Sequence, residues 1–263
     1  MRIDNNAANR LHRLLTQAKQ LPGNTLMGEA WRKVLRLETD DLSLLLLRLG
    51  RLLELPHRVQ AELQRVDAFN PGLHLRWKPA VDKAFSGLNL GAAIEPFQRL
   101  VDQTSLYSLE VCGDLLARFA PERVLEREEI SELWDKAQEL LQSLDSSDLP
   151  VELDAYLRKH ATSIIEALSS YDVVGVSGVQ NAVESAVGSI PFNASVLARI
   201  REQDKPVFRK FWTLLARAAL IVSLTTDMVQ LGQSVVALLP EPAVTAVEID
   251  ELPAAEPPDT NPA

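Results

Sequence analysis

Histidine and cysteine side chains are common metal ligands and catalytic groups, and this chain has few of them. Its four histidines lie far apart in the sequence: His12, His57, His74 and His160. The single cysteine, Cys112, excludes an intramolecular disulfide and a cysteine-rich zinc site. Its helical surroundings (SLEVCGDLLARF) predict a small buried thiol. We therefore expect neither a metal nor any other cofactor.

A pair of glycines in the segment GVSGVQNAVESAVGSI could present backbone N–H groups to a phosphate. A P-loop would require a Gly-Lys-Ser/Thr ending, and a nucleophile elbow would require glycine where Val179 stands. The segment instead places small residues on one face of a helix: Gly178, Ala182, Ser185 and Ser189. Such a stripe lets two helices approach closely, so Gly178 and Ala182 are candidates for a helix–helix interaction.

An arginine and a histidine in the stretch RLLELPH, Arg51 and His57, are separated by five residues. This spacing resembles the catalytic motif of the HEPN-type ribonucleases, which are all-helical proteins. The resemblance covers seven residues, and Leu52 stands where the family usually has a polar residue. It implies RNA cleavage by Arg51 and His57, which is one alternative for the function of this chain.

A long apolar segment near the end of the chain carries its polar residues on one narrow face. A helix over 206–239 would place Asp227, Gln230 and Gln233 along a polar seam, and these are candidate interaction residues. A charge such as Asp227 near the middle costs a lone membrane-spanning helix about 3 kcal/mol. We therefore expect a central helix of a soluble bundle with its seam in water. The alternative is a membrane-active effector whose copies insert together, with the seam around an aqueous path.

Apolar residues recur at helical spacing nearly throughout, which predicts an all-α, multi-helix bundle of about nine to ten helices. The stretch TDDLSLLLLRLGRLLEL, starting from Thr39 or Asp40 as N-cap, is apolar on every side, so we expect a central helix there. Pro56 is expected to break that helix before a short one over 57–66. The other helices are expected over 5–20, 25–37, 73–88, 91–121 (one or two), 124–145, 150–171, 174–190 and 194–203.

Charge is unevenly distributed along the chain. The net charge is −9, yet residues 1–120 carry 16 Lys and Arg against 13 Asp and Glu, and residues 121–263 carry 11 against 23. We expect an N-terminal helical bundle over 1–120 and a C-terminal bundle over 121–240 packed on it, with one continuous domain as the alternative. The proline-rich, acidic residues 241–263 cannot bury enough apolar surface to fold alone, and we expect a disordered tail.

The leading functional hypothesis is a non-enzymatic interaction, scaffold or regulatory protein that binds a partner protein or its own copies. The negative net charge argues against nucleic-acid binding, which requires a basic face. In the one basic stretch with an aromatic ring, HLRWK, we expect Trp77 to belong to the core. No small-molecule substrate is indicated. The amino terminus lacks the features of a secretory signal, so we expect a cytoplasmic protein.

Overall fold

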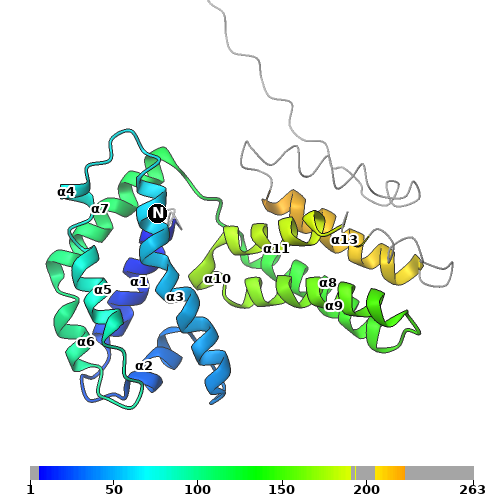
Figure 1. The fold of residues 1–263 in the computed structure, drawn as a ribbon, viewed down its shortest axis with the longest axis horizontal. Coiled ribbons are helices and arrows are strands. Elements are labelled where there is room, and N and C mark those ends of the chain that lie inside the picture. Colours follow the sequence, from blue (N-terminus) through cyan, green and yellow to red (C-terminus); the bar gives the residue numbers. More distant parts are fainter. Residues whose placement is uncertain (1–5, 191–192, 194–204, 223–263) are drawn as a thin grey trace, which may run out of the picture.

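The chain folds into helices, as its periodicity predicts. The computed structural model describes residues 6–190, 193 and 205–222. Within them it has twelve helices, of which nine have seven residues or more, and one isolated antiparallel β-bridge between Leu26 and Ala93 (Figure 1). In chain order the helices are α1 (Ala7–Gln20), α2 (Met27–Val34), α3 (Leu42–Leu63), α4 (Pro71–His74), α5 (Lys78–Ser86), α6 (Glu95–Leu100), α7 (Gln103–Phe119), α8 (Arg127–Asp145), α9 (Val151–Ser169), α10 (Tyr171–Val174), α11 (Val176–Gly188) and α13 (Lys205–Val222).

Three predicted elements fall outside the described residues. These are the helix over 194–203, the part of the 206–239 helix that follows Val222, and the acidic tail over 241–263.

The buried apolar residues form two clusters. The first runs from Ala7 to Leu116 and also includes Val173 of α10, and the second runs from Leu125 to Val222. We call α1–α7 the N-terminal lobe and α8, α9, α11 and α13 the C-terminal lobe, with α10 between them (Figure 1). Val173 of α10 belongs to the first cluster although it follows residue 120, so the two clusters do not coincide with the predicted division into 1–120 and 121–240. That division remains a prediction.

α1 lies inside the N-terminal lobe, and its sequence explains why. Its apolar side chains all lie on one buried face, as predicted: Ala7, Ala8, Leu11, Leu14, Leu15 and Ala18. Asn6 caps the helix by accepting a hydrogen bond from the N–H of Asn9, and its amide donates to the carbonyl oxygen of Gly113 at 2.9 Å. A Cβ at Gly113 would overlap the side-chain amide of Asn9, so glycine is needed where α7 approaches α1.

Two predicted core residues are buried in the same lobe. Trp77 is fully buried, as predicted, and so is Cys112, whose thiol donates to the carbonyl oxygen of His74 at 3.0 Å. Burial raises the pKa of the Cys112 thiol to about 11, which makes the thiolate rare near neutral pH.

The prediction that Pro56 breaks a helix is wrong. α3 is continuous over 22 residues with Pro56 inside it, and its N-cap is Asp41, whose carboxylate accepts from the N–H of Ser43, instead of Thr39 or Asp40. A proline inside a helix removes one hydrogen bond and costs about 3 kcal/mol. The helix buries apolar side chains on both sides of the proline, from Leu45 to Leu63, and this burial exceeds the local cost.

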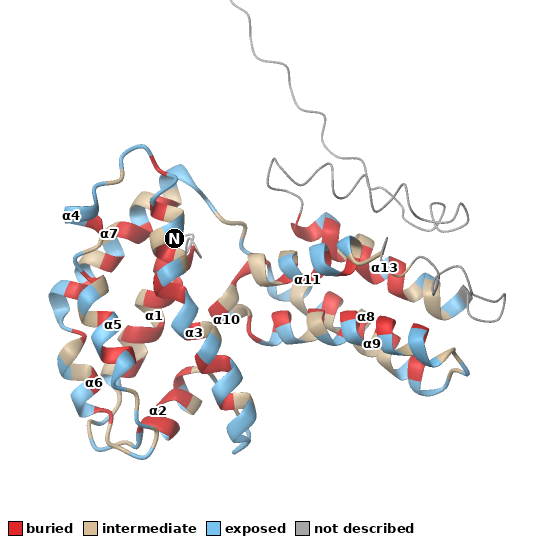
Figure 2. Ribbon diagram, in the orientation of Figure 1, coloured by how far each residue is buried: buried red, intermediate tan, exposed pale blue. Residues whose placement is uncertain are grey.

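The prediction that α3 is a central helix is also wrong. Four of its leucines are exposed by 37–53%: Leu42, Leu46, Leu47 and Leu53. Only one face of α3 packs on the N-terminal lobe, and Figure 2 shows much of its N-terminal half in the colour of exposed residues. An apolar composition on every side thus did not indicate burial on every side.

The C-terminal lobe is built from two long antiparallel helices, α8 and α9, on which α11 and α13 pack. A capping box formed by Glu126 and Glu129 starts α8. Buried apolar side chains hold α13 against α8, and Arg217 of α13 pairs with Glu132 of α8 at 2.8 Å at the partly exposed edge of that contact. Among the described residues, no helix combines the length and the apolar character that a bilayer span requires.

Candidate interaction surface

The two lobes meet at a junction where arginines bind backbone carbonyls. Four guanidinium groups of the N-terminal lobe donate to carbonyl oxygens of α9 and α10 at 2.9–3.1 Å: Arg10 to Val173, Arg13 to Asp172, Arg51 to Glu166 and Arg58 to Val174. The last carbonyls of a helix lack partners within the helix and carry partial negative charge. The arginines bind carbonyls at these ends, although that of Glu166 also accepts from the N–H of Ser170 and that of Val174 from the hydroxyl of Ser177. They thereby hold the ends of α9 and α10 against the N-terminal lobe.

Carboxylates complete the junction. Arg10, whose side chain is fully buried, pairs with Glu122 at 2.6 Å, and Arg58 pairs with Glu122 at 3.0 Å and with Glu62 at 2.9 Å. Burial, together with the nearby charge of Glu122, raises the pKa of Glu62, while Arg58 opposes that rise. The charges of this cluster compensate one another, which is the condition for keeping them away from water.

Gly175 lets the chain turn between α10 and α11 directly beside the buried guanidinium. Its φ of +66° is rarely open to other residues, and a Cβ there would overlap the Arg10 guanidinium. The glycine-rich stretch considered for phosphate binding therefore serves a tight turn at the junction.

The two residues of the ribonuclease-like motif lie on the same helix but on different faces. Arg51 points toward α9, where it also hydrogen bonds the hydroxyl of Ser170 and pairs with the carboxylate of Glu166 at 3.3 Å. His57 is exposed, and six residues correspond to about one and two-thirds turns of α3. No interaction joins these two side chains within the described structure.

Of the remaining candidate residues, Gly178 and Ala182 lie in α11. A Cβ at Gly178 would overlap Val174 and would contact the Cβ of Ala167 at 3.8 Å, and Ala182 is buried within the second cluster. Asp227, Gln230 and Gln233 lie outside the described residues.

A polar cluster inside the C-terminal lobe was missed by the sequence analysis. Ser189 Oγ lies 3.1 Å from His160 Nε2, and the hydroxyl of Tyr156 donates to the carbonyl oxygen of Ala186 at 3.1 Å. A serine beside a histidine suits nucleophilic catalysis when a third group orients the ring. Here the described neighbours of His160 are the rings of Tyr156 and Phe211, and burial lowers the pKa of His160. The cluster satisfies polar groups in a core, and the i, i+4 spacing of Tyr156 and His160 was its only signal.

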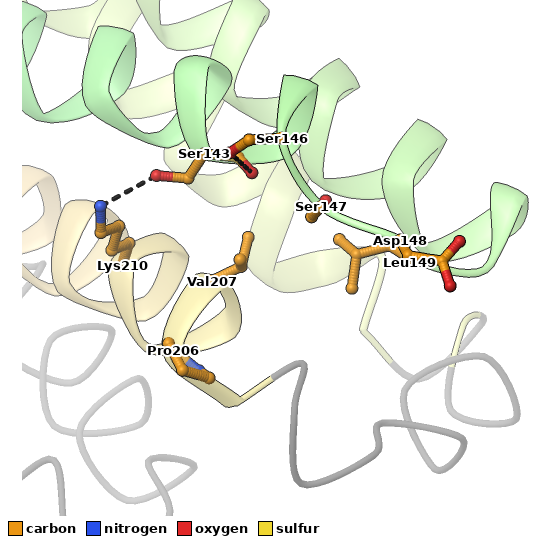
Figure 3. A pocket seen from close by; sticks show the side chains of 8 residues that line it. All are labelled: Ser143, Ser146, Ser147, Asp148, Leu149, Pro206, Val207 and Lys210. Atoms are coloured by element: carbon orange, nitrogen blue, oxygen red, sulfur yellow. Dashed lines mark hydrogen bonds between the residues drawn. The ribbon is translucent and has the colours of Figure 1, made fainter.

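Neither a metal-binding cluster nor an enclosed substrate site is evident in the part of the chain that the structure describes. No group of three His, Cys, Asp or Glu residues there could hold an ion. Figure 3 shows a polar recess of about 380 Å³ where α8 ends against the start of α13. Its lysine, Lys210, already donates to Ser143 Oγ at 2.9 Å and pairs with Glu139 at 2.7 Å, which lowers the pKa of Glu139.

Among the described residues, α3 carries the largest group of exposed apolar side chains on one helix. We call Leu42, Leu46, Leu47 and Leu53 the leucine face. Leu42, Leu46 and Leu53 recur at intervals of four and seven residues, so they project from one side of the helix. Gly50 lies on the same side, and a Cβ added there would meet no atom within 4 Å. The face is therefore a row of apolar side chains with an open position at its centre.

Charged residues border the leucine face unequally. Its amino-terminal end carries exposed acids, Glu38, Asp40 and Asp41, and its other end carries exposed His57 and Arg65. Of the three acids, Asp40 makes a long ion pair with Arg32, at 3.9 Å, and remains exposed. That same end also carries exposed Glu54 and Asp67, so the face has an acidic end and an end of mixed charge.

Comparisons with known proteins add no family to this description: no family model matches the sequence, and neither a curated protein nor a solved structure matches the chain.

Proposed function

We propose that this chain is a non-enzymatic interaction protein that binds another protein molecule through the leucine face of α3. The observation that carries the proposal is the exposure of four leucines on one helix of a chain whose other large apolar side chains mostly lie in two cores. Burying one leucine fully contributes about 1.5–3 kcal/mol. Contiguous apolar patches on water-soluble proteins commonly mark sites of interaction.

The arrangement of the other functional groups supports binding over catalysis. The arginines at the junction and Lys210 are committed to ion pairs or carbonyls, and His160 lies inside a core. A catalytic site needs groups that converge on an accessible substrate. The face of α3 on which none of the described residues packs is apolar, which suits a protein partner better than a nucleic acid or a small polar molecule.

We also propose a cytoplasmic location, which agrees with a chain whose only thiol is buried and unpaired.

A photo-crosslinking amino acid tests the proposal in cells that make the full chain. Placed at Leu46 it should give a discrete adduct upon illumination, whereas at Leu73, which is exposed to a similar degree on α4, it should give none. The change Leu53→Glu in the Leu46-labelled protein should abolish the adduct, because a carboxylate would have to be buried in the contact. An absence of adducts at Leu46, or equal adducts at both positions, would refute the proposal.

A further inference from the structure

We infer that Arg48 and Arg51 of α3, together with Ser169 of α9, bind a phosphate group, either free or carried by a small molecule, where the two lobes meet. The inference does not depend on the proposed function, because it concerns the side of α3 that faces α9. Figure 1 shows the two helices close together beside α10, from which the N-terminal half of α3 and α9 lead away in different directions.

The first argument is Arg48, a buried cation with no carboxylate of the described chain at ion-pair distance. It is 7% exposed, and the hydroxyl of Ser169, at 2.8 Å, is the hydrogen-bond partner that the described chain gives its guanidinium. Its Nε is buried without a partner there. Burial, together with the positive charge of Arg51, lowers the pKa of Arg48, and the carboxylate of Glu166 offsets this only in part. A buried charge that is short of partners lowers stability, so this guanidinium suits an anion from outside the chain.

The second argument is the weak hold on the neighbouring carboxylate. Glu166 pairs with Arg51 at 3.3 Å, and its side chain is 47% exposed. An exposed ion pair contributes little to stability, so the carboxylate can turn into water when a stronger anion arrives. Arg51 would keep its bonds to the carbonyl oxygen of Glu166 and to the hydroxyl of Ser170, and it would therefore stay in place.

The third argument is the hydroxyl of Ser169, which a ligand can recruit at little cost. It donates to the carbonyl oxygen of Glu166 at 3.1 Å, and that oxygen also accepts from Arg51 and from the N–H of Ser170. A carbonyl oxygen has two lone pairs, so it stays satisfied if the hydroxyl turns away. Ser169 is exposed, which leaves it open to a ligand from the solvent.

The charges indicate the class of ligand. With Glu166 turned into water, the two guanidinium groups carry two positive charges, which a phosphate dianion matches and a single carboxylate does not. Guanidinium groups also bind phosphate oxygens in pairs. The net charge of −9 opposes the approach of a polyanion, and a guanidinium as buried as that of Arg48 is open only to a small group. A free phosphate or a small phosphorylated molecule therefore fits best.

Calorimetric titration of the full chain, at constant ionic strength and about pH 8 to keep phosphate dianionic, tests the inference. The probes are inorganic phosphate, adenosine monophosphate and acetate. The parent chain should bind phosphate saturably, and acetate at least about tenfold more weakly. Tighter binding of adenosine monophosphate than of phosphate would assign the site to a small phosphorylated molecule, and equal or weaker binding would assign it to free phosphate.

Substitutions of opposite expected sign locate the site. Arg48→Met should weaken phosphate binding at least about tenfold, because it removes a charged hydrogen-bond donor. Arg76→Met, which removes an exposed arginine of the same lobe, should leave the binding unchanged. Glu166→Gln should tighten it severalfold, because the competing charge is gone, whereas Glu152→Gln, at an exposed position of the same helix, should not.

Urea unfolding separates binding from folding. Phosphate should stabilise the parent protein and leave the stability of Arg48→Met unchanged. Three results would overturn the inference: no saturable binding by the parent, acetate binding as tight as phosphate binding, or phosphate binding that survives Arg48→Met. If Arg48→Met does not fold, Glu166→Gln decides, and binding no tighter than that of Glu152→Gln would count against the site.

Discussion

His160 is a titratable side chain held in the core of the C-terminal lobe. It is 2% exposed, and the centroid of its ring lies 4.7 Å from the centroid of the Tyr156 ring. Its Nε2 lies 3.1 Å from Ser189 Oγ. Burial lowers its pKa below the ordinary value of 6.5, and the positive charge of Lys159 lowers it further. The ring is therefore neutral in the folded protein at neutral pH, and protonation would place an uncompensated charge among aromatic side chains.

The sign of the resulting pH dependence follows from this lowered pKa. Below 6.5 the unfolded chain binds a proton at His160 and the folded chain does not, so the stability contributed by the neutral ring is complete above that pH and is lost as the pH falls through the folded pKa. One such group changes the free energy of unfolding by at most about 1.4 kcal/mol per pH unit. We expect His160→Gln to unfold with a weaker pH dependence between about pH 7.5 and pH 5.5 than the parent protein.

Urea unfolding at several pH values measures this difference. The pKa of His12 is also lowered by burial, so His12→Gln is the control that removes the other contribution. Parallel curves for the parent protein and His160→Gln would contradict the account of His160.

Among the elements, the turn between α10 and α11 depends on one residue type. Gly175 has a φ of +66° and a ψ of −165°, and the guanidinium of Arg10 occupies the space of its missing Cβ. We expect Gly175→Ala to lower the free energy of unfolding by about 2–4 kcal/mol, because the alanine would be strained and would displace a buried charge. Gly87→Ala is the control: its φ is −96° and the nearest atom to its Cβ would lie at 3.7 Å. Equal stability of the two variants, measured by urea unfolding, would show that the turn tolerates a side chain.

The helices themselves could largely be predicted from the sequence, because their periodicity is local. α1, α8 and α9 occupy nearly the expected ranges, and the buried face of α1 is the expected one. α3 shows where local reasoning fails. The effect of Pro56 depends on how much apolar surface the helix buries on either side of it, and the exposure of the leucine face depends on which helices pack nearby; neither quantity is encoded in the neighbouring residues.

The arrangement of the candidate surfaces could not be predicted, because it arises between distant segments. Arg10 meets Glu122 and Val173 across separations of 112 and 163 residues. The motif considered for catalysis, Arg51 and His57, looked functional through its spacing alone, and the tertiary fold gives Arg51 a role at the junction. The spacing of Arg51 and His57 therefore did not indicate the role of Arg51, because its contacts are made with residues far away in the sequence.

At the scale of the whole molecule, the junction decides how the two lobes share their stability. Each lobe has its own apolar cluster, and the buried Arg10 contacts both the connecting segment at Glu122 and the backbone of α10. We expect Arg10→Met to lower the free energy of unfolding by about 3 kcal/mol, because it leaves Glu122 with one fewer partner in a poorly hydrated site. It should also speed amide hydrogen exchange in α10 while exchange in the middle of α8 stays unchanged.

The double variant Arg10→Met with Glu122→Gln separates charge from packing. Removing both charges should recover part of the lost stability, because no carboxylate is then left short of a partner. A single variant as stable as the parent protein, or uniform acceleration of exchange over both lobes, would rule out this role for Arg10.

The separations spanned by Arg10 also have a consequence for synthesis. Arg10 leaves the ribosome early, but Val173 is made 163 residues later. At about 5–20 residues per second this delay amounts to roughly 10–30 seconds. During that time the first helix carries an arginine whose place in the fold does not yet exist. In a nascent chain, the N-terminal lobe therefore cannot enclose the charge of Arg10 until the second half of the chain has been translated.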